Sequence, residues 1–274
     1  MPHSLINGVN LYFETVGGGG PPLVFIHELA GDYRSWEPQL RAFARSHTCI
    51  TFSARGYLPS GIPADPQAYS QRQSAADVIR LLDHLGIDRA HLVGLSMGGF
   101  VTLQAGLDFP QRVCSMTIAG CGSGSEPHRY AEKRAAFRAM SQQVAADGAL
   151  AFVRACEAEP TRASFRSRDP RGWAEFIARL AEHDATGLSL TLHQVQGSRP
   201  SLWDFEDALR RTRIPALILC GDQDEPCLQP SLFLARTLAD ARLAVLPGCG
   251  HVLNLEEPAL FNAFLRDFLA TATP

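Results

Sequence analysis

Short apolar runs recur along this chain, and polar segments with helical periodicity separate them. Apolar runs of this length are typical of parallel strands that are buried on both faces. Between two of the runs, residues 75–85 carry apolar side chains at helical spacing and stop at Gly86, a residue type that commonly ends a helix. The alternation predicts an α/β fold with a doubly wound, mostly parallel sheet. The runs lie at residues 23–26, 49–52, 91–93, 113–119, 216–220 and 243–246.

The two ends of the chain extend this pattern. Near the start, Asn7 and Gly8 stand between alternating apolar residues, which is a strong signal for a β-hairpin. Near the end, Pro258 suits the first turn of a helix that we expect to continue to about Leu269. An antiparallel pair of strands should therefore come first and a helix last.

The alternation of apolar runs and helical segments stops between residues 123 and 211. Arginine, alanine and glutamate dominate this stretch, and it contains no β-rich run. We expect a mostly helical insertion at 123–211 that forms a cap over the carboxyl edge of the sheet. Residues 1–122 and 212–274 then make up the α/β core.

Composition narrows the class of protein. The chain has 274 residues, 46% of them hydrophobic and 19% charged, which suits one catalytic domain with a sizeable core. A net charge of -3 without clustered basic residues indicates neither a nucleic-acid partner nor an anionic membrane surface. A small neutral or weakly charged molecule is the expected substrate, and a homodimer is an open alternative to a monomer. Residues 1–16 lack the features of a signal peptide and no apolar run could span a bilayer, so we expect a cytoplasmic protein.

The cysteines give no sign of a metal site. There are seven of them, an odd number, and they are scattered without a C-x-x-C pair. Cys114 and Cys220 lie in apolar runs and are expected to be reduced core residues. We expect neither a metal nor a cofactor.

Ser96 lies at the centre of a G-x-S-x-G sequence at residues 94–98. An apolar run at 91–93 precedes the motif and an apolar helical pattern at 100–105 follows it. A strand before and a helix after are the context of a nucleophile elbow, a strained turn that exposes the serine while the first amides of the helix face an incoming anion. Ser96 is therefore the predicted nucleophile.

A serine hydroxyl needs a histidine to remove its proton and a carboxylate to hold that histidine. His251 follows the last apolar run in a glycine-containing loop, and Asp224 follows the run before it, so both should reach the carboxyl edge of the sheet. The order serine, aspartate, histidine along the chain is that of α/β-hydrolases. The rival residues are His27, His84, His91 and His193 for the base and Asp222 for the acid.

Three blocks of the sequence resemble the signature blocks of the capped α/β-hydrolase superfamily. The blocks are residues 94–99, 221–224, and 250–251 followed by 256–258. The similarity covers nearly the whole chain outside the insertion, and the chain most resembles the branch with enol-lactonases, small esterases, C–C bond hydrolases and cofactor-free haloperoxidases. The resemblance implies that the acid is Asp224 rather than Asp222. Some relatives carry the acid after an earlier strand, but residues 119–121 of this chain have no carboxylate.

The developing oxyanion of an acyl transfer needs preorganised donors. The N–H of Met97, directly after the nucleophile, is the first predicted donor. The family usually has His-Gly-x in the loop after the strand at 23–26, where this chain has His27, Glu28 and Leu29. By position, the resemblance implies that the N–H of Leu29 is the second donor.

Glu28 departs from the family pattern because a carboxylate replaces the usual glycine. In one interpretation its side chain turns away from the site and pairs with an arginine or a loop amide. In the other it binds a cationic or hydroxyl-bearing substrate, or positions water. The residues that start at His27 also begin a zinc-protease H-E-x-x-H motif, but Gly31 occupies the place of the second histidine.

Two further features concern the shape of the site. Relatives commonly have Asp and Gly where this chain has Ser53 and Tyr57, so we expect an altered loop there. Trp203 lies where the insertion returns to the sheet, and it is a candidate for substrate binding, although aromatic residues like it more often serve packing.

These residues predict a serine hydrolase that cleaves a small carboxylic ester, lactone or related acyl substrate through an acyl-enzyme. Hydrolysis of a C–C bond in a ring-cleavage dienoate uses the same triad but usually a longer glycine-rich loop than residues 27–29. Cofactor-free perhydrolysis, as in the haloperoxidases, shares the elbow. A ligand receptor with little turnover is the alternative from another class. Substrate choice should depend on the cap.

Overall fold

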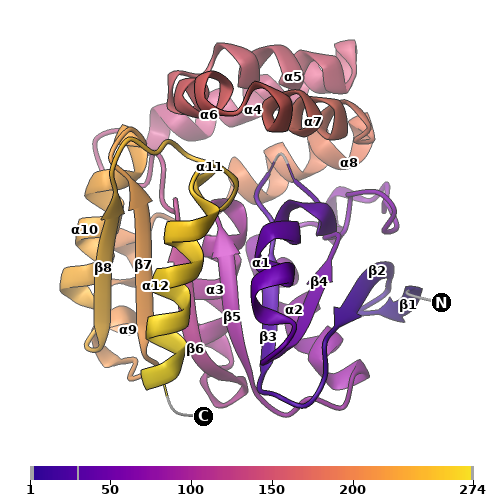
Figure 1. The fold of residues 1–274 in the computed structure, drawn as a ribbon. Helices are drawn as coiled ribbons and strands as arrows, with labels where there is room; N and C mark the ends of the chain where they lie inside the picture. Colours follow the sequence, from indigo (N-terminus) through magenta and orange to yellow (C-terminus); the bar gives the residue numbers. More distant parts are fainter. Residues whose placement is uncertain (1–2, 30, 273–274) are drawn as a thin grey trace.

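The computed structural model describes residues 3–29 and 31–272. Their strands form one eight-stranded sheet in the order β1-β2-β4-β3-β5-β6-β7-β8 (Figure 1). β2 pairs antiparallel with β1 and β4, and the other neighbours are parallel. The doubly wound, mostly parallel sheet that the apolar runs predict is therefore confirmed. The strands are β1 (His3–Ile6), β2 (Val9–Val16), β3 (Pro22–Ile26), β4 (Thr48–Phe52), β5 (Ala90–Leu95), β6 (Val113–Ala119), β7 (Ala216–Gly221) and β8 (Ala241–Leu246).

The hairpin at the start of the chain has a two-residue turn. Ile6 pairs with Val9, so Asn7 and Gly8 alone connect β1 and β2. Both turn residues have positive φ, 50° for Asn7 and 77° for Gly8. Asparagine and glycine adopt this conformation most easily, which explains why this dipeptide predicts the hairpin.

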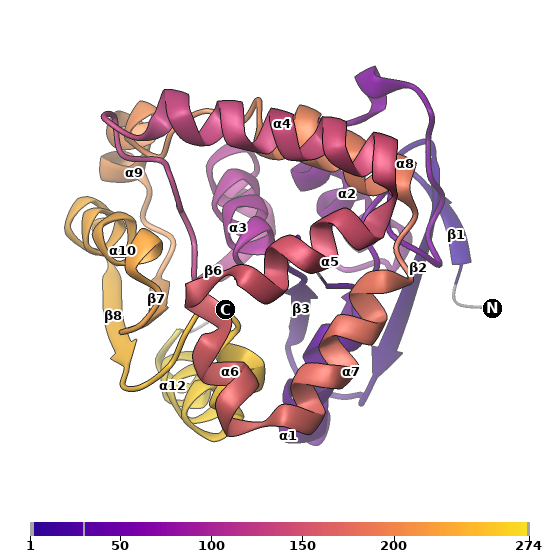
Figure 2. The same ribbon diagram turned by 90° about the horizontal axis from the view of Figure 1, so that it is seen from above.

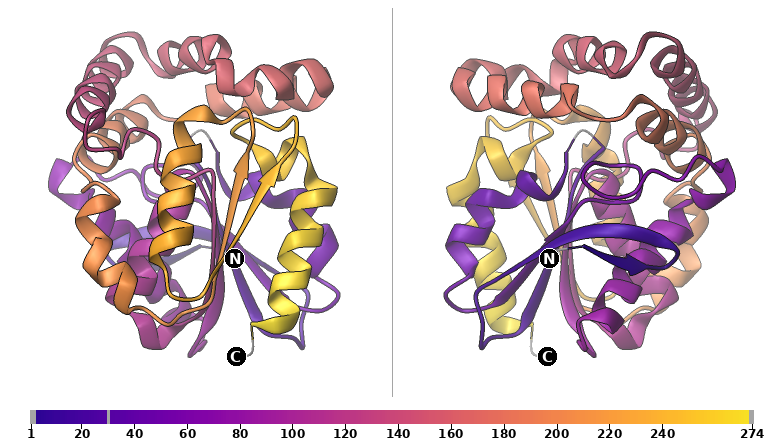
Figure 3. Two further views of the ribbon diagram at one scale, coloured as in Figure 1. Left: turned by 90° about the vertical axis from the view of Figure 1, so that its left-hand side faces the viewer. Right: turned by 90° about the vertical axis from the view of Figure 1, so that its right-hand side faces the viewer.

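Helices cover both faces of the sheet, as the two side views in Figure 3 show. α1 (Glu37–Phe43) and α12 (Pro258–Thr271) lie on one face, where Phe25 of β3 and Phe261 of α12 share an apolar cluster. α2 (Gln71–His84), α3 (Met97–Asp108) and α10 (Glu225–Thr237) lie on the other, where Val24 of β3 and Leu103 of α3 share a second cluster. Val24 and Phe25 serve opposite faces because successive side chains of a strand alternate.

A layer of helices lies over the carboxyl ends of the parallel strands (Figures 1 and 2). α9 (Glu206–Arg211), also within the predicted insertion 123–211, contacts α10 instead, and its Leu209 belongs to the core beside the sheet. The insertion therefore both covers the edge of the sheet and returns to the core. The cap helices are α4 (Tyr130–Asp147), α5 (Ala149–Ala158), α6 (Ala163–Arg168), α7 (Pro170–Ala181) and α8 (Ala185–Leu190), with short turns η4 (Pro160–Arg162) and η5 (Thr191–Gln196).

The remaining elements are short and connect the larger ones. Within the part of the chain that the structure describes, no helix is both long and apolar enough to cross a membrane. The cysteines at 114 and 220 are buried and unpaired, as their apolar surroundings predict. The short elements are η1 (Tyr33–Trp36), η2 (Pro66–Ala68), η3 (Pro110–Arg112), η6 (Trp203–Phe205) and α11 (Leu253–Glu256).

Candidate active site

Ser96 occupies a sharp turn between β5 and α3. Its backbone has φ 55° and ψ -110°, a conformation that few side chains adopt. The turn is possible because glycines flank it: a Cβ at Gly94 would lie 2.1 Å from the Gly98 carbonyl oxygen, and a Cβ at Gly98 would lie 2.0 Å from the Ile26 carbonyl oxygen. The Ser96 N–H donates to the Ala119 carbonyl at 2.8 Å, which holds the turn against β6.

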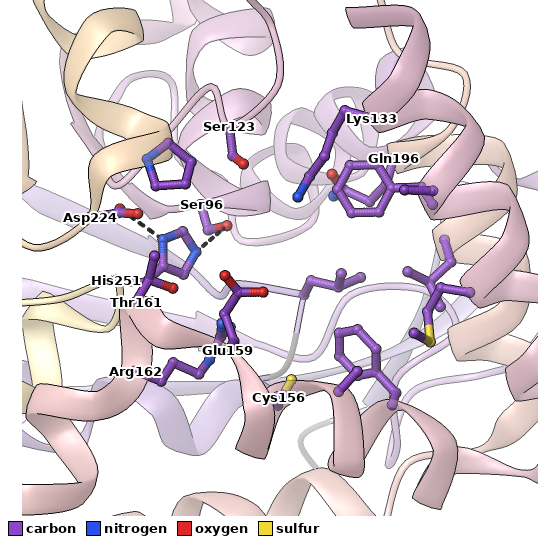
Figure 4. Close-up of a pocket in the computed structure, with 18 of the residues that line it drawn as sticks. Ser96, Ser123, Lys133, Cys156, Glu159, Thr161, Arg162, Gln196, Asp224 and His251 are labelled. Carbon is purple, nitrogen blue, oxygen red and sulfur yellow. Dashed lines mark hydrogen bonds and ion pairs between the residues drawn. The ribbon is translucent and has the colours of Figure 1, made fainter. Parts of the chain in front are cut away.

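His251 lies between Ser96 and Asp224 (Figure 4). Its Nε2 is 2.9 Å from Ser96 Oγ, and its Nδ1 is 2.8 Å from Asp224 Oδ2. A carboxylate accepts hydrogen bonds, so Nδ1 carries the ring proton and Nε2 is free to accept the proton of Ser96. The structure thus brings together the three residues that the sequence predicts, and they can move a proton away from the serine.

The environment of Asp224 keeps it ionised. Its side chain is almost fully buried, and burial by itself would raise the pKa. The charge and hydrogen bond of His251 outweigh burial and lower the pKa of Asp224 below its ordinary value. The rival Asp222 is exposed, and its Oδ1 accepts the Cys249 N–H at 3.1 Å, so it braces the neighbouring loop.

Three of the rival histidines have partners outside this cluster. His84 Nε2 lies 2.9 Å from Ser4 Oγ, and His91 Nδ1 lies 2.8 Å from Ser115 Oγ. The ring of His27 forms hydrogen bonds with the backbone of Glu28 and Ala54. The fourth, His193, is absent from the residues that line the cavity around Ser96.

Glu256 holds the loop that carries His251. Its carboxylate accepts the N–H groups of Gly250 at 2.8 Å and Val252 at 2.9 Å, and also the hydroxyl of Ser164 from the cap. The His251 N–H itself donates to the Thr161 carbonyl of the cap at 2.9 Å. Glu256 lies in the third signature block, but no sequence pattern predicts this role, because the cap side of these contacts has no motif.

The loop after β3 is held by His27 and Tyr57. The Ala54 N–H donates to His27 Nε2 at 3.0 Å, so the ring proton lies on Nδ1, which donates to the Glu28 carbonyl at 2.7 Å. Burial lowers the pKa of His27 to about 4, which keeps the ring neutral. The Tyr57 hydroxyl donates to the Leu29 carbonyl at 2.9 Å. Tyr57, in the segment where the sequence predicts an altered loop, thus holds a different loop, the one after β3.

The two residues whose N–H groups are the predicted oxyanion donors lie next to the nucleophile in the sequence (Met97) and in the wall of its cavity (Leu29). Met97 is the first residue of α3, so its N–H has no partner four residues earlier within the helix. Leu29 lines the cavity around Ser96, and its N–H donates to no other residue in the described ranges. Neither amide therefore has a backbone acceptor among the described residues, and their role as oxyanion donors stays a prediction.

A family model described as alpha/beta hydrolase fold matches residues 21–258. The chain belongs to the α/β hydrolase fold family. The match includes the elbow, Asp224 and His251, and it shows that the protein is a hydrolase of this fold, as the signature blocks predict.

Named relatives align with this α/β hydrolase over most of its length. A protein of Pseudomonas savastanoi pv. phaseolicola named "Putative carbamate hydrolase RutD" is 31% identical over 92% of the chain and 95% of its own length. The 3-oxoadipate enol-lactonase 2 of Acinetobacter baylyi is 27% identical over 93% of the chain and 91% of its own length. The crystal structure of the enol-lactonase from Burkholderia xenovorans LB400 has a TM-score of 0.84 at 24% identity, covering 98% of this chain and 100% of that one. This last likeness shows the shared fold.

The hydrolase has a cavity of about 210 Å³ between the sheet edge and the cap, with Ser96, His251 and Leu29 in its wall. Glu28 is not among the lining residues; it is 1% exposed, and its Oε1 accepts the Ser35 hydroxyl at 3.3 Å. Burial raises the pKa of Glu28 above its ordinary value. Trp203 is also outside the wall, since it stacks on Phe233 with ring centroids 4.2 Å apart.

The structure thus places neither Glu28 nor Trp203, the two residues that the sequence suggests for substrate binding, against the cavity. The cap supplies much of the lining instead. The lining includes charged residues that no sequence pattern predicts, because only the packing of the cap brings them to Ser96: Lys133, Glu159, Arg162 and Arg199.

Asp224, Cys227 and His251 are close enough to hold a metal ion, since a ligand atom of each lies within 4.8 Å of the others. His251 Nδ1 and Asp224 Oδ2 are already joined by a hydrogen bond, and Cys227 Sγ donates to the Gly120 carbonyl at 3.3 Å. Burial raises the pKa of the Cys227 thiol well above its ordinary value of 9.0, which disfavours the thiolate that a metal binds. The donor set therefore favours an acid–base pair over a metal centre.

Proposed function

We propose that this α/β hydrolase cleaves a small carboxylic ester or lactone through an acyl-enzyme on Ser96. The observation that carries the proposal is the chain of two hydrogen bonds from Ser96 Oγ through His251 to Asp224, at 2.9 and 2.8 Å. A base on one side of the serine and a buried carboxylate behind the base are what nucleophilic acyl transfer requires.

The proposed reaction has two steps. In the first, His251 Nε2 takes the proton of Ser96 while Oγ attacks the substrate carbonyl, and the protonated histidine then gives that proton to the departing alkoxide. In the second, water loses a proton to the same nitrogen and attacks the acyl-enzyme, which releases the acid and restores Ser96. Asp224 stays ionised throughout and stabilises the imidazolium.

The amides of Leu29 and Met97 are proposed to bind the oxyanion in both steps. Such donors typically contribute roughly 3 to 4 kcal/mol each to transition-state stabilisation. Glu28 does not oppose this role, because its side chain lies outside the cavity wall. C–C bond hydrolysis would change the bond that is cleaved, and perhydrolysis would replace water by hydrogen peroxide as the second substrate; neither alternative changes the nucleophile.

The test is active-site labelling combined with ester hydrolysis. Wild-type protein should be labelled on Ser96 by a fluorophosphonate and should hydrolyse p-nitrophenyl esters, and Ser96→Ala should lose both. Ser198→Ala, an exposed serine outside the cavity wall, is the matched control. Undiminished turnover by Ser96→Ala would refute the proposal. An absence of labelling in the wild type would support a receptor instead.

A substrate panel separates the remaining candidates. It comprises short-chain esters, lactones, a ring-cleavage dienoate and, because of the name of the relative with 31% identity, an N-alkyl carbamate. Esters or lactones should have the largest kcat/KM. A clear preference for the dienoate or the carbamate would replace the proposed substrate class without changing the role of Ser96.

A further inference from the structure

Arg199 is a buried cation in the wall of the active-site cavity. Its side chain is 7% exposed, and it lines the same cavity as Ser96. Nη2 donates to the Ser123 carbonyl at 3.3 Å, and the guanidinium carbon lies 4.6 Å from the centroid of the Phe100 ring. Among the described residues, no carboxylate forms an ion pair with Arg199. A buried charge without a counter-charge costs free energy. A bound anion would supply the counter-charge that the described residues do not.

Lys133 of α4 brings a second cation to the same part of the cavity. Its Nζ lies 5.3 Å from the centroid of the Phe137 ring, and the guanidinium carbon of Arg199 lies 6.0 Å from that centroid. Figure 4 shows Lys133 pointing into the cavity near Ser123 and Gln196. The Lys133 side chain has no ion pair or hydrogen bond to any residue in the ranges described. Two unpaired cations therefore share one wall.

We propose that this wall binds a free carboxylate of the substrate, so that the hydrolase acts on esters or lactones of dicarboxylic acids. The inference rests on the proposed function, because it concerns the substrate of Ser96. Arg199 and Lys133 form charge-assisted hydrogen bonds with the carboxylate, and the Ser123 hydroxyl lies beside them in the lining. The scissile carbonyl then lies at Ser96, with the carboxylate at the opposite end of the acyl chain.

The other charges of the cavity agree with this orientation. Glu159 is the acid of the lining that does not belong to the Ser96–His251–Asp224 cluster, and Figure 4 shows it entering from the side opposite Lys133. Arg162 lies near Glu159 in the figure and has no ion pair with any described residue. The charges of Glu159 and Arg162 therefore offset each other on that side, whereas Lys133 and Arg199 share a wall and attract a carboxylate to it.

The size of the cavity limits the length of the acyl chain. Its volume of about 210 Å³ lies below the range of roughly 300 to 1,000 Å³ that is usual for drug-sized ligands. A chain of a few carbons between the two carbonyl carbons suits this space. Glutarate half-esters are therefore suitable probes.

The test compares monomethyl glutarate with methyl valerate, in which a methyl group replaces the carboxylate. Acid release is followed in a pH-stat, and kcat/KM is measured for each ester. The wild type should prefer the glutarate ester, and Lys133→Met and Arg199→Met should each reduce the ratio of the two kcat/KM values about tenfold, as expected for loss of one charged hydrogen bond. Arg138→Met, an exposed cation on the same helix as Lys133 and outside the lining, should leave the ratio unchanged.

The outcomes separate this inference from the proposed function. If Ser96 is labelled by a fluorophosphonate but the wild type prefers methyl valerate, the carboxylate site alone is overturned. The same holds if neither variant changes the ratio of the two kcat/KM values. Failure of Ser96 labelling would overturn the proposed function. Lys133 is only partly buried, so Lys133→Met decides the question by itself if Arg199→Met does not fold.

Discussion

At the scale of single residues, Glu28 is the clearest departure from the family pattern. A glycine is usual at this position, yet the carboxyl of Glu28 is 1% exposed and its Oε2 has no hydrogen-bond partner among the described residues. Among the described residues, the one side chain that donates to it is Ser35, at 3.3 Å. A buried, poorly satisfied carboxyl costs free energy when it ionises, so Glu28 should influence stability rather than substrate binding.

Glu28→Gln should become more stable relative to wild type as the pH rises. Well below 4.5, the ordinary pKa of this group, glutamate is protonated in both the folded and the unfolded state. Above that value the unfolded chain releases the proton while burial raises the pKa in the fold, so the free energy of unfolding of the wild type falls with pH. Urea unfolding at about pH 5 and pH 8 measures the difference. An advantage of the variant that does not grow with pH contradicts the prediction, and Glu37→Gln, an exposed glutamate, is the control.

A second residue-scale prediction concerns Tyr57, whose hydroxyl is the donor that holds the Leu29 carbonyl. Tyr57→Phe keeps the buried ring and removes that hydrogen bond, so the Leu29 amide becomes less well oriented. We expect kcat for ester hydrolysis to fall about tenfold, with a smaller change in KM, because an oxyanion donor acts in the transition state. Steady-state kinetics on a p-nitrophenyl ester tests this. A change confined to KM would point to a role in substrate binding.

At the scale of elements, the cap and the core meet at the loop of His251. This loop follows β8, and Glu256 of α11 accepts the backbone N–H groups on both sides of the histidine. Ser164 of α6 and Thr161 of η4 add contacts from the cap. The position of the imidazole therefore depends on α11 and on a cap segment, η4 and α6, that lies far from it in the sequence.

Glu256→Ala should lower kcat about tenfold while KM changes less, because two N–H groups lose their acceptor and the imidazole loses its fixed position. Glu256→Gln retains an acceptor oxygen and should recover part of the loss. The rate of fluorophosphonate labelling of Ser96 should follow kcat across the series. Glu37→Ala, which removes an exposed partner of Arg41, should leave both rates unchanged. Equal activity of the Ala variant and the wild type would exclude a positioning role.

At the scale of the whole molecule, the cap is joined to the core by apolar packing and by surface ion pairs. Phe165 of α6 is 2% exposed; it contacts the rings of Trp173 and Phe176 within the cap, and it shares an apolar cluster with Leu253 and Phe261 of the core. Arg168 on the same helix pairs with Glu257 of the core, but its side chain is 46% exposed. Packing should therefore contribute much more to the attachment of the cap than the ion pair does.

Two variants of α6 measure this difference. Phe165→Ala should reduce the free energy of unfolding by roughly 3 to 5 kcal/mol, because it removes a buried aromatic ring and leaves a cavity. Arg168→Ala should change it by less than about 1 kcal/mol, as is usual for an exposed ion pair. Urea unfolding followed by circular dichroism measures both. Equal effects would contradict the prediction, because the ion pair would then contribute as much to stability as the buried ring does.

The sequence by itself determined the sheet, the elbow and the order of the three residues around the nucleophile. Asn7 and Gly8 predict their hairpin, and Gly94 and Gly98 predict the turn at Ser96, because positive φ and close backbone approach select glycine or asparagine within a few residues. Buried strands leave short apolar runs for the same local reason. The catalytic role of Ser96 stays a prediction until it is labelled.

Only the tertiary structure decided what surrounds those residues. In the structure Glu28 lies outside the cavity wall and Trp203 stacks on Phe233. Lys133 and Arg199 line the cavity near Ser96. The net charge of -3 does not reveal this local group of cations, because it sums the charges of the whole chain. Side chains on separate helices converge only when those helices pack, and helical periodicity predicts which face of the cap is apolar but not which charged side chains will point at the serine.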